Sequence, residues 1–355
     1  MRFLITGENG FVGRNLGRVI QEMGHEFLPI ELPALEEANL ANLFLDAWHF
    51  QTGENAVPCV HKNGPDVWAS LFEALDVDVV IHNAAVVGTD VVGLNPEEAT
   101  LTNVLGTRNI VEAANSFGIP VCYLGTSVIY DVVRYQEVPI IENDSRRPPT
   151  YYGALKLAGE EIVRSTAARW NVLRPLFAYG GVGDMNSLIA KSYYAYLTGR
   201  ESLDMFLDPS KIKDYIYVDD FCRAIIISCT GGHWGTDFNI AAETPVPVRE
   251  IVESMEGVMR SQGLLPKIEL GASALEQMLL WHPETDYLGN HRMTSLKFRE
   301  VSGWTPEVSM YEGLERVLKS IQASIKDSGS YNPLQFLEQA ERDGVNLVEF
   351  FPDKV

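Results

Sequence analysis

RFLITGENGFVG, residues 2–13, is the stretch that decides the expected fold. Its first part, Arg2–Thr6, is mostly apolar and predicts a short strand, and three glycines follow before a helix that we expect to run to about Met23. A glycine-rich turn between a strand and a helix cradles a pyrophosphate, because glycine lets the backbone approach the phosphates and free N–H groups attract their charge. The stretch therefore predicts a dinucleotide-binding turn.

Strands and helices alternate after this turn, which is typical of an α/β protein with a doubly wound parallel sheet of the Rossmann type. We expect strands over residues 26–30, 57–61, 76–82, 120–124 and 170–173, and helices over 35–48, 96–117 and 152–168. Beyond residue 174 the alternation loosens. There we expect strands over 214–218 and 238–241 and helices over 186–198, 221–229, 248–260, 311–326 and 333–342.

These patterns predict a division of the chain into three parts. Residues 1–174 would form the NAD-binding domain, to which residues 214–242 return. Residues 175–330 would form a smaller substrate-binding α/β lobe, and residues 331–355 a helical extension whose role the sequence does not indicate.

The chain is strongly acidic, with 48 Asp and Glu residues against 28 Lys and Arg among 355 residues, a net charge of −20. Such a surface repels nucleic acids and anionic membranes, so we expect neither as a partner. The 4 cysteines and 7 histidines show no metal-ligand spacing, and we expect no metal. Since no secretory signal or long apolar run is visible, we expect a cytoplasmic protein.

Tyr152 and Lys156 are four residues apart and therefore share one face of the expected helix. A free tyrosine titrates near pH ~10, and a nearby ammonium lowers that pKa, which allows proton transfer at neutral pH. From the spacing alone, a solvated lysine beside a packed tyrosine remains an alternative. The catalytic interpretation is favoured because Asp66, Asn83 and Thr126 also follow strands, where ligands of such sheets bind.

Glu31 stands at the end of the second expected strand, about 20 residues past the glycines. A carboxylate there holds the ribose 2′-hydroxyl of NAD and repels the 2′-phosphate of NADP. We therefore expect NAD rather than NADP. An ordinary exposed glutamate at a strand end is the alternative.

Further motifs follow in a fixed order along roughly the first 320 residues. They are Asn83-Ala84-Ala85, Asn103-x-x-Gly106-Thr107, Thr126 with Tyr130, Arg174-Pro175 with Tyr179-Gly180, Asp214-Tyr215, Phe238-Asn239 and Gly303-Trp304-x-Pro306. Together with the glycine turn and Tyr152-x-x-x-Lys156, they resemble the extended short-chain dehydrogenase/reductase family, in its NAD-dependent epimerase/dehydratase group.

The resemblance implies a set of site residues. Thr126, Tyr152 and Lys156 would be catalytic, with Tyr152 as acid/base, Thr126 bonded to the reacting oxygen and Ser127 as the fallback hydroxyl. The implied cofactor contacts are Gly7, Gly10, Phe11, Val12, Glu31, Asp66, Val67, Asn83, Ala84, Ala85, Asn103, Tyr152, Lys156 and Leu176. The implied substrate contacts are Thr126, Ser127, Phe177, Asn186, Lys213 and Arg292. The helices over 96–117 and 152–168 are those that the family uses for a homodimer.

The implied chemistry is NAD-dependent hydride transfer at a secondary alcohol of a nucleotide sugar, most often epimerisation. The family's dehydratases place an Asp-Glu pair after the catalytic threonine, whereas this chain has Ser127-Val128, so we do not expect dehydration. The family's decarboxylases carry a glutamate at the position that Val128 occupies here, so we do not expect decarboxylation either. An NAD(P)-dependent dehydrogenase or ketoreductase and a catalytically idle dinucleotide-binding protein remain alternatives.

Two positions depart from the family pattern and leave the substrate open. Phe177 replaces an asparagine that touches the substrate diphosphate in many relatives, and Lys213 replaces an arginine. Lysine offers a point charge for a phosphate but no bidentate fork. Arg292 is either a further phosphate contact or a surface charge. A non-nucleotide alcohol therefore stays possible as the substrate.

Overall fold

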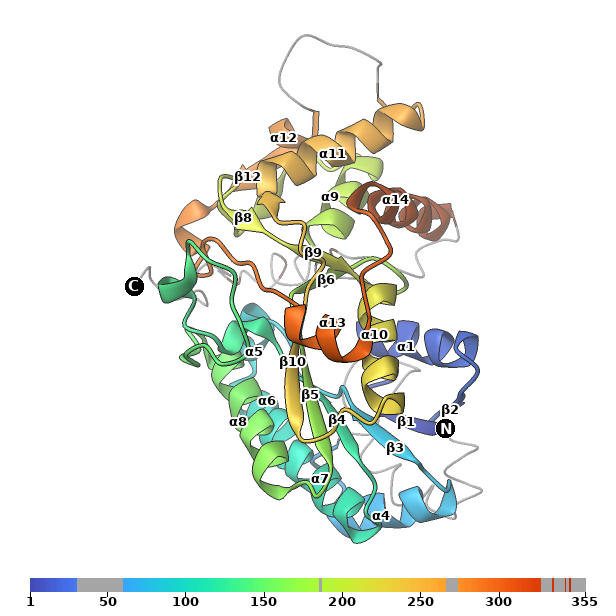
Figure 1. Ribbon diagram of the computed structural model, residues 1–355. Helices are drawn as coiled ribbons and strands as arrows, with labels where there is room; N and C mark the ends of the chain where they lie inside the picture. Colours follow the sequence, from blue (N-terminus) through green and yellow to red (C-terminus); the bar gives the residue numbers. More distant parts are fainter. Residues whose placement is uncertain are drawn as a thin grey trace.

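The computed structural model describes residues 1–30, 60–184, 187–265 and 274–326, together with residues 334, 342 and 345. Its centre is a parallel six-stranded sheet of order β10-β5-β4-β3-β1-β2 (Figure 1). The strands are β1 (Arg2–Thr6), β2 (Glu26–Leu28), β3 (Val79–His82), β4 (Val121–Leu124), β5 (Trp170–Pro175) and β10 (Thr236–Ile240). The expected doubly wound α/β fold is confirmed.

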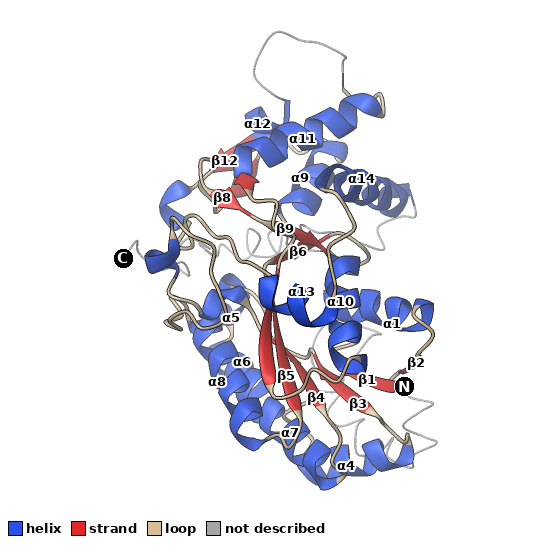
Figure 2. Ribbon diagram, in the orientation of Figure 1, coloured by secondary structure: helices blue, strands red, loops and turns tan. Residues whose placement is uncertain are grey.

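Side-chain alternation along the strands creates two core layers, because successive residues of a strand point to opposite faces. Phe3 and Ile5 pack with α1 (Phe11–Glu22) and α10 (Val218–Thr230). Leu4 packs on the other face with Trp68 of α4 (Pro65–Ala74) and Ile110 of α7 (Thr107–Ser116). Helices therefore cover both faces of the sheet (Figure 2).

One long helical segment is interrupted at its middle. It consists of α6 (Pro96–Thr100), a π-helical stretch (Leu101–Gly106) and α7, with α5 (Thr89–Leu94) before it. The next helix is α8 (Tyr151–Thr166), which packs beside α7. The expected helices over 96–117 and 152–168 are thus confirmed, apart from the π-helical interruption.

Small sheets and helices form the upper part of the molecule in Figure 1. The two-stranded pairs are β6 (Phe177–Tyr179) with β9 (Tyr215–Tyr217), β7 (Leu203–Met205) with β12 (Leu279–Trp281), and β8 (Ile212–Lys213) with β11 (Val246–Pro247). The helices there are α9 (Leu188–Leu197), α11 (Val248–Ser261), α12 (Ala274–Met278) and α14 (Met310–Lys326), whereas α13 (Leu296–Ser302) packs beside β10 of the large sheet. Between α10 and β11 the chain returns to the large sheet, where β10 pairs with β5. The three-part division of the chain stays a prediction.

The strand expected over residues 57–61 is wrong for its described part, because Val60 and His61 lie in a turn. The Val60 carbonyl there accepts from the Trp68 indole at 3.4 Å instead of joining a strand ladder. The helices expected over 35–48 and 333–342 lie outside the described residues, apart from single positions of the second. Within the part that is described, no helix combines the length and apolarity that crossing a membrane requires.

Candidate active site

The glycine turn follows β1 and lies against the segment that follows β3. Gly7 has a φ of +72°, and a Cβ there would lie 2.8 Å from the Ala84 Cα, so only glycine fits. The Asn83 side-chain amide donates to the Gly7 carbonyl oxygen at 2.9 Å and fixes the turn. Gly10 precedes α1 without a side-chain cap, and Phe11 and Val12 open the helix, whose free N–H groups suit an anion.

Glu8 adds a contact that the sequence reasoning missed. Its buried carboxylate accepts from the Ile30 backbone N–H at 2.9 and 3.1 Å, which ties the glycine turn to the end of β2. Glu31, the expected ribose contact, is the next residue and lies outside the described part. Asp66 and Val67, the expected adenine contacts, stand in the first turn of α4.

Asn103 holds the loop that follows β3. Its side-chain oxygen accepts from the Val86 N–H at 2.8 Å, and its amide donates to the Val86 carbonyl at 3.0 Å. Asn103 lies in the π-helical stretch, a geometry that often marks functional sites. The loop with Ala84 and Ala85, both expected to line the cofactor, is therefore fixed on both sides.

Thr126 and Tyr152 meet where β4 ends and α8 begins. Thr150 caps α8 by accepting from the Gly153 N–H at 3.1 Å, which places Tyr152 in the first turn. The Thr126 side chain interacts with the Tyr152 phenol closely enough to lower the pKa of that phenol. Its expected bond to the reacting oxygen stays a prediction. Ser127, the fallback hydroxyl, is buried in the short helix that Thr126 caps.

Lys156 is held at the end of β4. Its ammonium donates to the Leu124 carbonyl oxygen at 2.7 Å and lies 4.3 Å from the centre of the Tyr123 ring. Burial lowers the pKa of Lys156 to about 7 against the opposing charge of Glu160. Burial also raises the pKa of Tyr152 above its usual value, and the Thr126 hydrogen bond offsets only part of that rise. The Lys156 ammonium is held by a carbonyl in this structure, so the expectation that it lowers the Tyr152 pKa stays a prediction.

A pocket of about 300 Å³ lies beside the glycine turn, and Phe11 and Phe177 both line it. Its other walls come from the second part of the chain and from α5: Asp90, Ala178, Asp184, Ser187, Leu188, Lys191, Asp204, Met205, Phe206, Leu207 and Tyr215. Phe177 thus lines a pocket, and its expected contact with the substrate stays a prediction. Lys191 and the three carboxylates were not singled out in the sequence, because no local motif marks them.

The other expected substrate contacts are placed differently. Lys213 is fully buried and donates to Asp286 Oδ1 at 2.8 Å and to the Gly289 carbonyl at 2.7 Å. Arg292 donates to the Glu137 carbonyl at 2.6 Å. Neither residue lines the 300 Å³ pocket. Asn186 lies outside the described residues, and Leu176, an expected cofactor contact, is buried in a small core cluster beside Tyr130.

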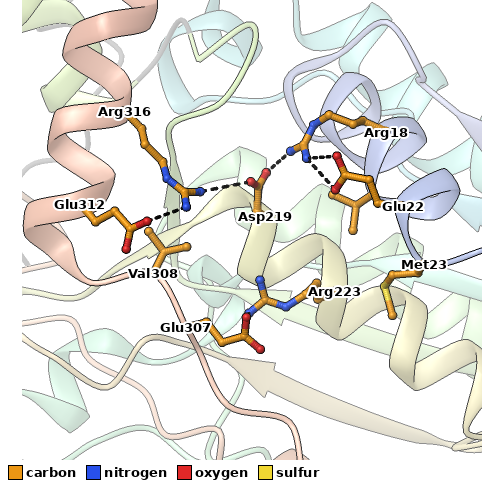
Figure 3. A pocket seen from close by; sticks show the side chains of 10 residues that line it. Arg18, Glu22, Met23, Asp219, Arg223, Glu307, Val308, Glu312 and Arg316 are labelled. Atoms are coloured by element: carbon orange, nitrogen blue, oxygen red, sulfur yellow. Dashed lines mark hydrogen bonds and ion pairs between the residues drawn. The ribbon is translucent and has the colours of Figure 1, made fainter.

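A larger hollow of about 530 Å³ lies on another part of the surface, between α1, α10 and α14 (Figure 3). Arg18, Asp219 and Arg316 line it, and the Asp219 carboxylate accepts from Arg18 and forms an ion pair with Arg316 at 3.6 Å. It contains none of the residues expected in catalysis. The smaller pocket is not lined by Thr126, Tyr152 or Lys156 either, but Phe11 and Phe177, an expected cofactor contact and an expected substrate contact, line it. We place the candidate active site there for this reason.

Comparison with known proteins identifies the family of the chain. The model of the NAD-dependent epimerase/dehydratase family matches residues 3–241. The chain belongs to this family. It is therefore an NAD-dependent enzyme of the extended short-chain dehydrogenase kind, and the resemblance seen in the sequence is confirmed.

Its relatives span almost the whole chain. UDP-glucose 4-epimerase of Mycolicibacterium smegmatis is 25% identical over 330 residues, covering 90% of this chain and 98% of the relative. dTDP-glucose 4,6-dehydratase of Mycobacterium tuberculosis is 25% identical over 322 residues, covering 86% and 95%. The solved UDP-glucose 4-epimerase of Thermotoga maritima with UDP-glucose has a TM-score of 0.71 at 20% identity, covering 92% and 100%.

Proposed function

We propose that this enzyme catalyses NAD-dependent hydride transfer at a secondary alcohol of a nucleotide sugar, and that the net reaction is epimerisation. The observation that supports it most directly is the close approach of Thr126 and Tyr152 at the carboxyl end of the sheet, where ligands of this fold bind. Relatives of the chain include a UDP-glucose 4-epimerase and a UDP-glucuronate 4-epimerase.

The glycine turn fits the pyrophosphate of a dinucleotide. Gly7 leaves no room for a side chain, and the N-terminus of α1 offers its N–H groups. Gly7, Gly10, Phe11 and Val12 would hold the pyrophosphate, and Ala84, Ala85 and Asn103 would line the cofactor. NAD supplies the hydride acceptor and donor when bound.

The protein's own residues would handle the proton. Tyr152 with a raised pKa is a protonated phenol at neutral pH, which suits it to donate a proton to a carbonyl oxygen. To accept a proton, the phenolate needs a cation beside it. We propose that Lys156 supplies it by turning its ammonium from the Leu124 carbonyl toward Tyr152. Thr126 would orient the reacting oxygen.

Epimerisation is favoured over dehydration because the positions after Thr126 carry no carboxylic acid. Ser127 and Val128 stand there, and both side chains are buried. Elimination of water needs a general acid and base at that place. A dehydrogenase or ketoreductase, which needs only the hydroxyl, tyrosine and lysine, is the second candidate.

The nucleotide-sugar substrate, the cytoplasmic location and a homodimer formed through α6, α7 and α8 are parts of the same proposal. The solved relatives with UDP-glucose support the substrate. The aromatic side chain of Phe177 and the internal pairing of Lys213 leave few groups for a diphosphate, so Lys191 is the pocket cation that would meet it.

The function is tested with purified protein and a panel of UDP- and dTDP-hexoses. We expect the configuration of one hydroxyl to be inverted, as monitored by proton NMR. We expect no net rise in the absorbance of NADH. Steady accumulation of NADH would replace the epimerase with a dehydrogenase. Mass spectrometry of co-purified ligands identifies NAD(H) and any nucleotide sugar independently.

A further inference from the structure

His82 lies at the carboxyl end of β3 with only 1% of its surface exposed. Both ring nitrogens are hydrogen-bonded to threonines from different elements. Nδ1 is 2.7 Å from the hydroxyl of Thr6, at the end of β1, and Nε2 is 2.9 Å from the hydroxyl of Thr107, at the start of α7. The imidazole therefore bridges the strand that leads into the glycine turn and the helix that follows the π-helical stretch.

The direction of these bonds is fixed by the groups at the two ends. The Thr107 hydroxyl is 2.7 Å from the Asn103 carbonyl oxygen, and a carbonyl only accepts, so the single hydroxyl proton of Thr107 is used there. The Nε2 atom of His82 must then donate to Thr107. In a neutral imidazole Nδ1 is left as the acceptor, and the Thr6 hydroxyl donates to it. The same Thr6 oxygen accepts from the Ala84 N–H at 3.2 Å.

The result is an unbroken one-way chain of hydrogen bonds from the Ala84 N–H to the Asn103 carbonyl. We infer that His82 is a positioning residue for the cofactor, which acts by holding the loop at Ala84 in register with Asn103. The inference rests on the proposed function, since both residues are expected to line NAD. At the far end, the side chain of Asn103 hydrogen-bonds the backbone of Val86. The two ends of the hydrogen-bond chain therefore hold the same loop.

A protonated ring would break the chain, because a second N–H at Nδ1 cannot accept from Thr6. Burial and the nearby ammonium of Lys156 lower the pKa of His82 to about 3, so the ring stays neutral at ordinary pH. The Tyr123 ring, 5.8 Å away, packs beside it. The chain is thus a fixed support and not a pH switch.

A double-mutant cycle on NAD affinity tests the inference, because Thr6 and Thr107 would be coupled through His82. Thr6→Val and Thr107→Val should each weaken NAD binding roughly threefold to tenfold, as loss of one buried hydrogen bond does. The double variant should bind NAD no more weakly than the weaker-binding of the two single variants. In a His82→Leu background Thr107→Val should no longer change NAD affinity, whereas Thr6→Val still removes the acceptor of the Ala84 N–H. Thr6→Ser and Thr107→Ser, which keep the hydroxyls, should restore affinity.

The matched control is Thr230→Val, which removes a threonine hydroxyl that donates to the Ile226 carbonyl at 2.9 Å in α10. It should leave NAD affinity unchanged. Strictly additive effects of Thr6→Val and Thr107→Val would overturn the inference, even if the melting temperature falls. If the wild-type protein binds no NAD(H) at all, the proposed function fails instead.

A second measurement uses the unaltered protein, so it does not depend on how the variants fold. In protein labelled with ¹⁵N at histidine, His82 should give one neutral form with the proton on Nε2, unchanged from about pH 5 to 9. An Nδ1–H signal, or titration near the ~6.5 of a free histidine, would contradict the inference.

Discussion

The Lys156 ammonium donates to the Leu124 carbonyl oxygen at 2.7 Å, at the end of β4 and not at the Tyr152 phenol. A charge held in this way is costly for the folded protein, because burial penalises the ammonium. The cation that the proposed reaction requires therefore has a measurable effect on stability, and that effect depends on pH.

The first prediction concerns Lys156→Met. Burial lowers the pKa of Lys156 from 10.5 to about 7, so between these values the unfolded chain binds a proton that the folded chain does not. Stability of the wild type therefore rises with pH across this window. The variant lacks the buried charge, so the Tm of the variant minus that of the wild type should be largest at pH 7 and below. This difference should become smaller as the pH rises toward 10. The variant should also lose turnover. Calorimetry at stepped pH values measures this.

The control for this change is Lys319→Met, an exposed lysine of α14 that pairs with Glu315. Its Tm difference from wild type should be small and nearly constant with pH. A Lys156→Met protein whose Tm difference does not change with pH would show that the lysine is not buried as a charge.

The second prediction concerns the phenol. Tyr152→Phe should reduce kcat by roughly a hundredfold to ten-thousandfold, the usual size of a general acid–base contribution, and should leave NAD affinity unchanged. Tyr151→Phe is the matched control, because Tyr151 is the adjacent, half-exposed tyrosine whose hydroxyl bonds Thr100 at 2.6 Å. Kinetics and NAD titration of both variants decide. Full activity of Tyr152→Phe would remove Tyr152 as the acid/base.

The contrast between Tyr152 and Lys156 shows how far the sequence was informative. The glycine turn and most strand ends follow from local patterns, because backbone geometry fixes them, whereas the pairing of Thr126 with Tyr152 rests on the family resemblance. The direction of the Lys156 side chain depends on Leu124 and Tyr123, more than 30 residues away in sequence, which no local spacing encodes. The same holds for Lys213, whose partner Asp286 is 73 residues distant.

The strand expected over residues 57–61 failed for a related reason. Val60 is buried, as an apolar residue in a strand would be, but it is buried in a turn against Trp68. A short apolar run identifies a buried segment without specifying whether it pairs with a strand. The contact of Glu8 with Ile30 could not be predicted from the sequence either. The Glu8 carboxylate accepts from a backbone N–H, and every residue except proline offers such a donor.

The third prediction concerns the ionic cluster in which Asp237 pairs with Arg174, Arg164 and Lys297. Burial by itself raises the pKa of Asp237, but Arg174, Arg164 and Lys297 outweigh it and lower that pKa to about 2. The folded pKa is lower than the usual 3.8, so the stabilisation is complete above pH ~4 and is lost as pH falls toward 2. Asp237→Asn leaves buried Arg174 short of a counter-charge and should lower Tm by roughly 4–7 °C at pH 7.

The gap between Asp237→Asn and wild type should narrow below pH ~4, since both then lack the charge at this position. Asp76→Asn is the control, because the Asp76 side chain is 91% exposed in its pair with Arg2. Its Tm should stay within about 1 °C of wild type. A gap for Asp237→Asn that stays constant down to pH 2 would mean that the residue acts by packing and not by charge.

The fourth prediction tests whether the contact of α8 with the end of β4 sets the catalytic geometry. A Cβ at Gly153 would lie 2.8 Å from the Val128 carbonyl oxygen, which is backbone and cannot rotate aside. Gly153→Ala should therefore push the first turn of α8 outward, separate Tyr152 from Thr126 and lower kcat by at least about tenfold. Gly257→Ala, at an exposed position of α11 with no atom within 4 Å of the added Cβ, should instead keep full kcat and raise Tm slightly. Unchanged kcat in Gly153→Ala, measured beside this control, would show that the close approach of the two elements does not set the geometry of the reacting pair.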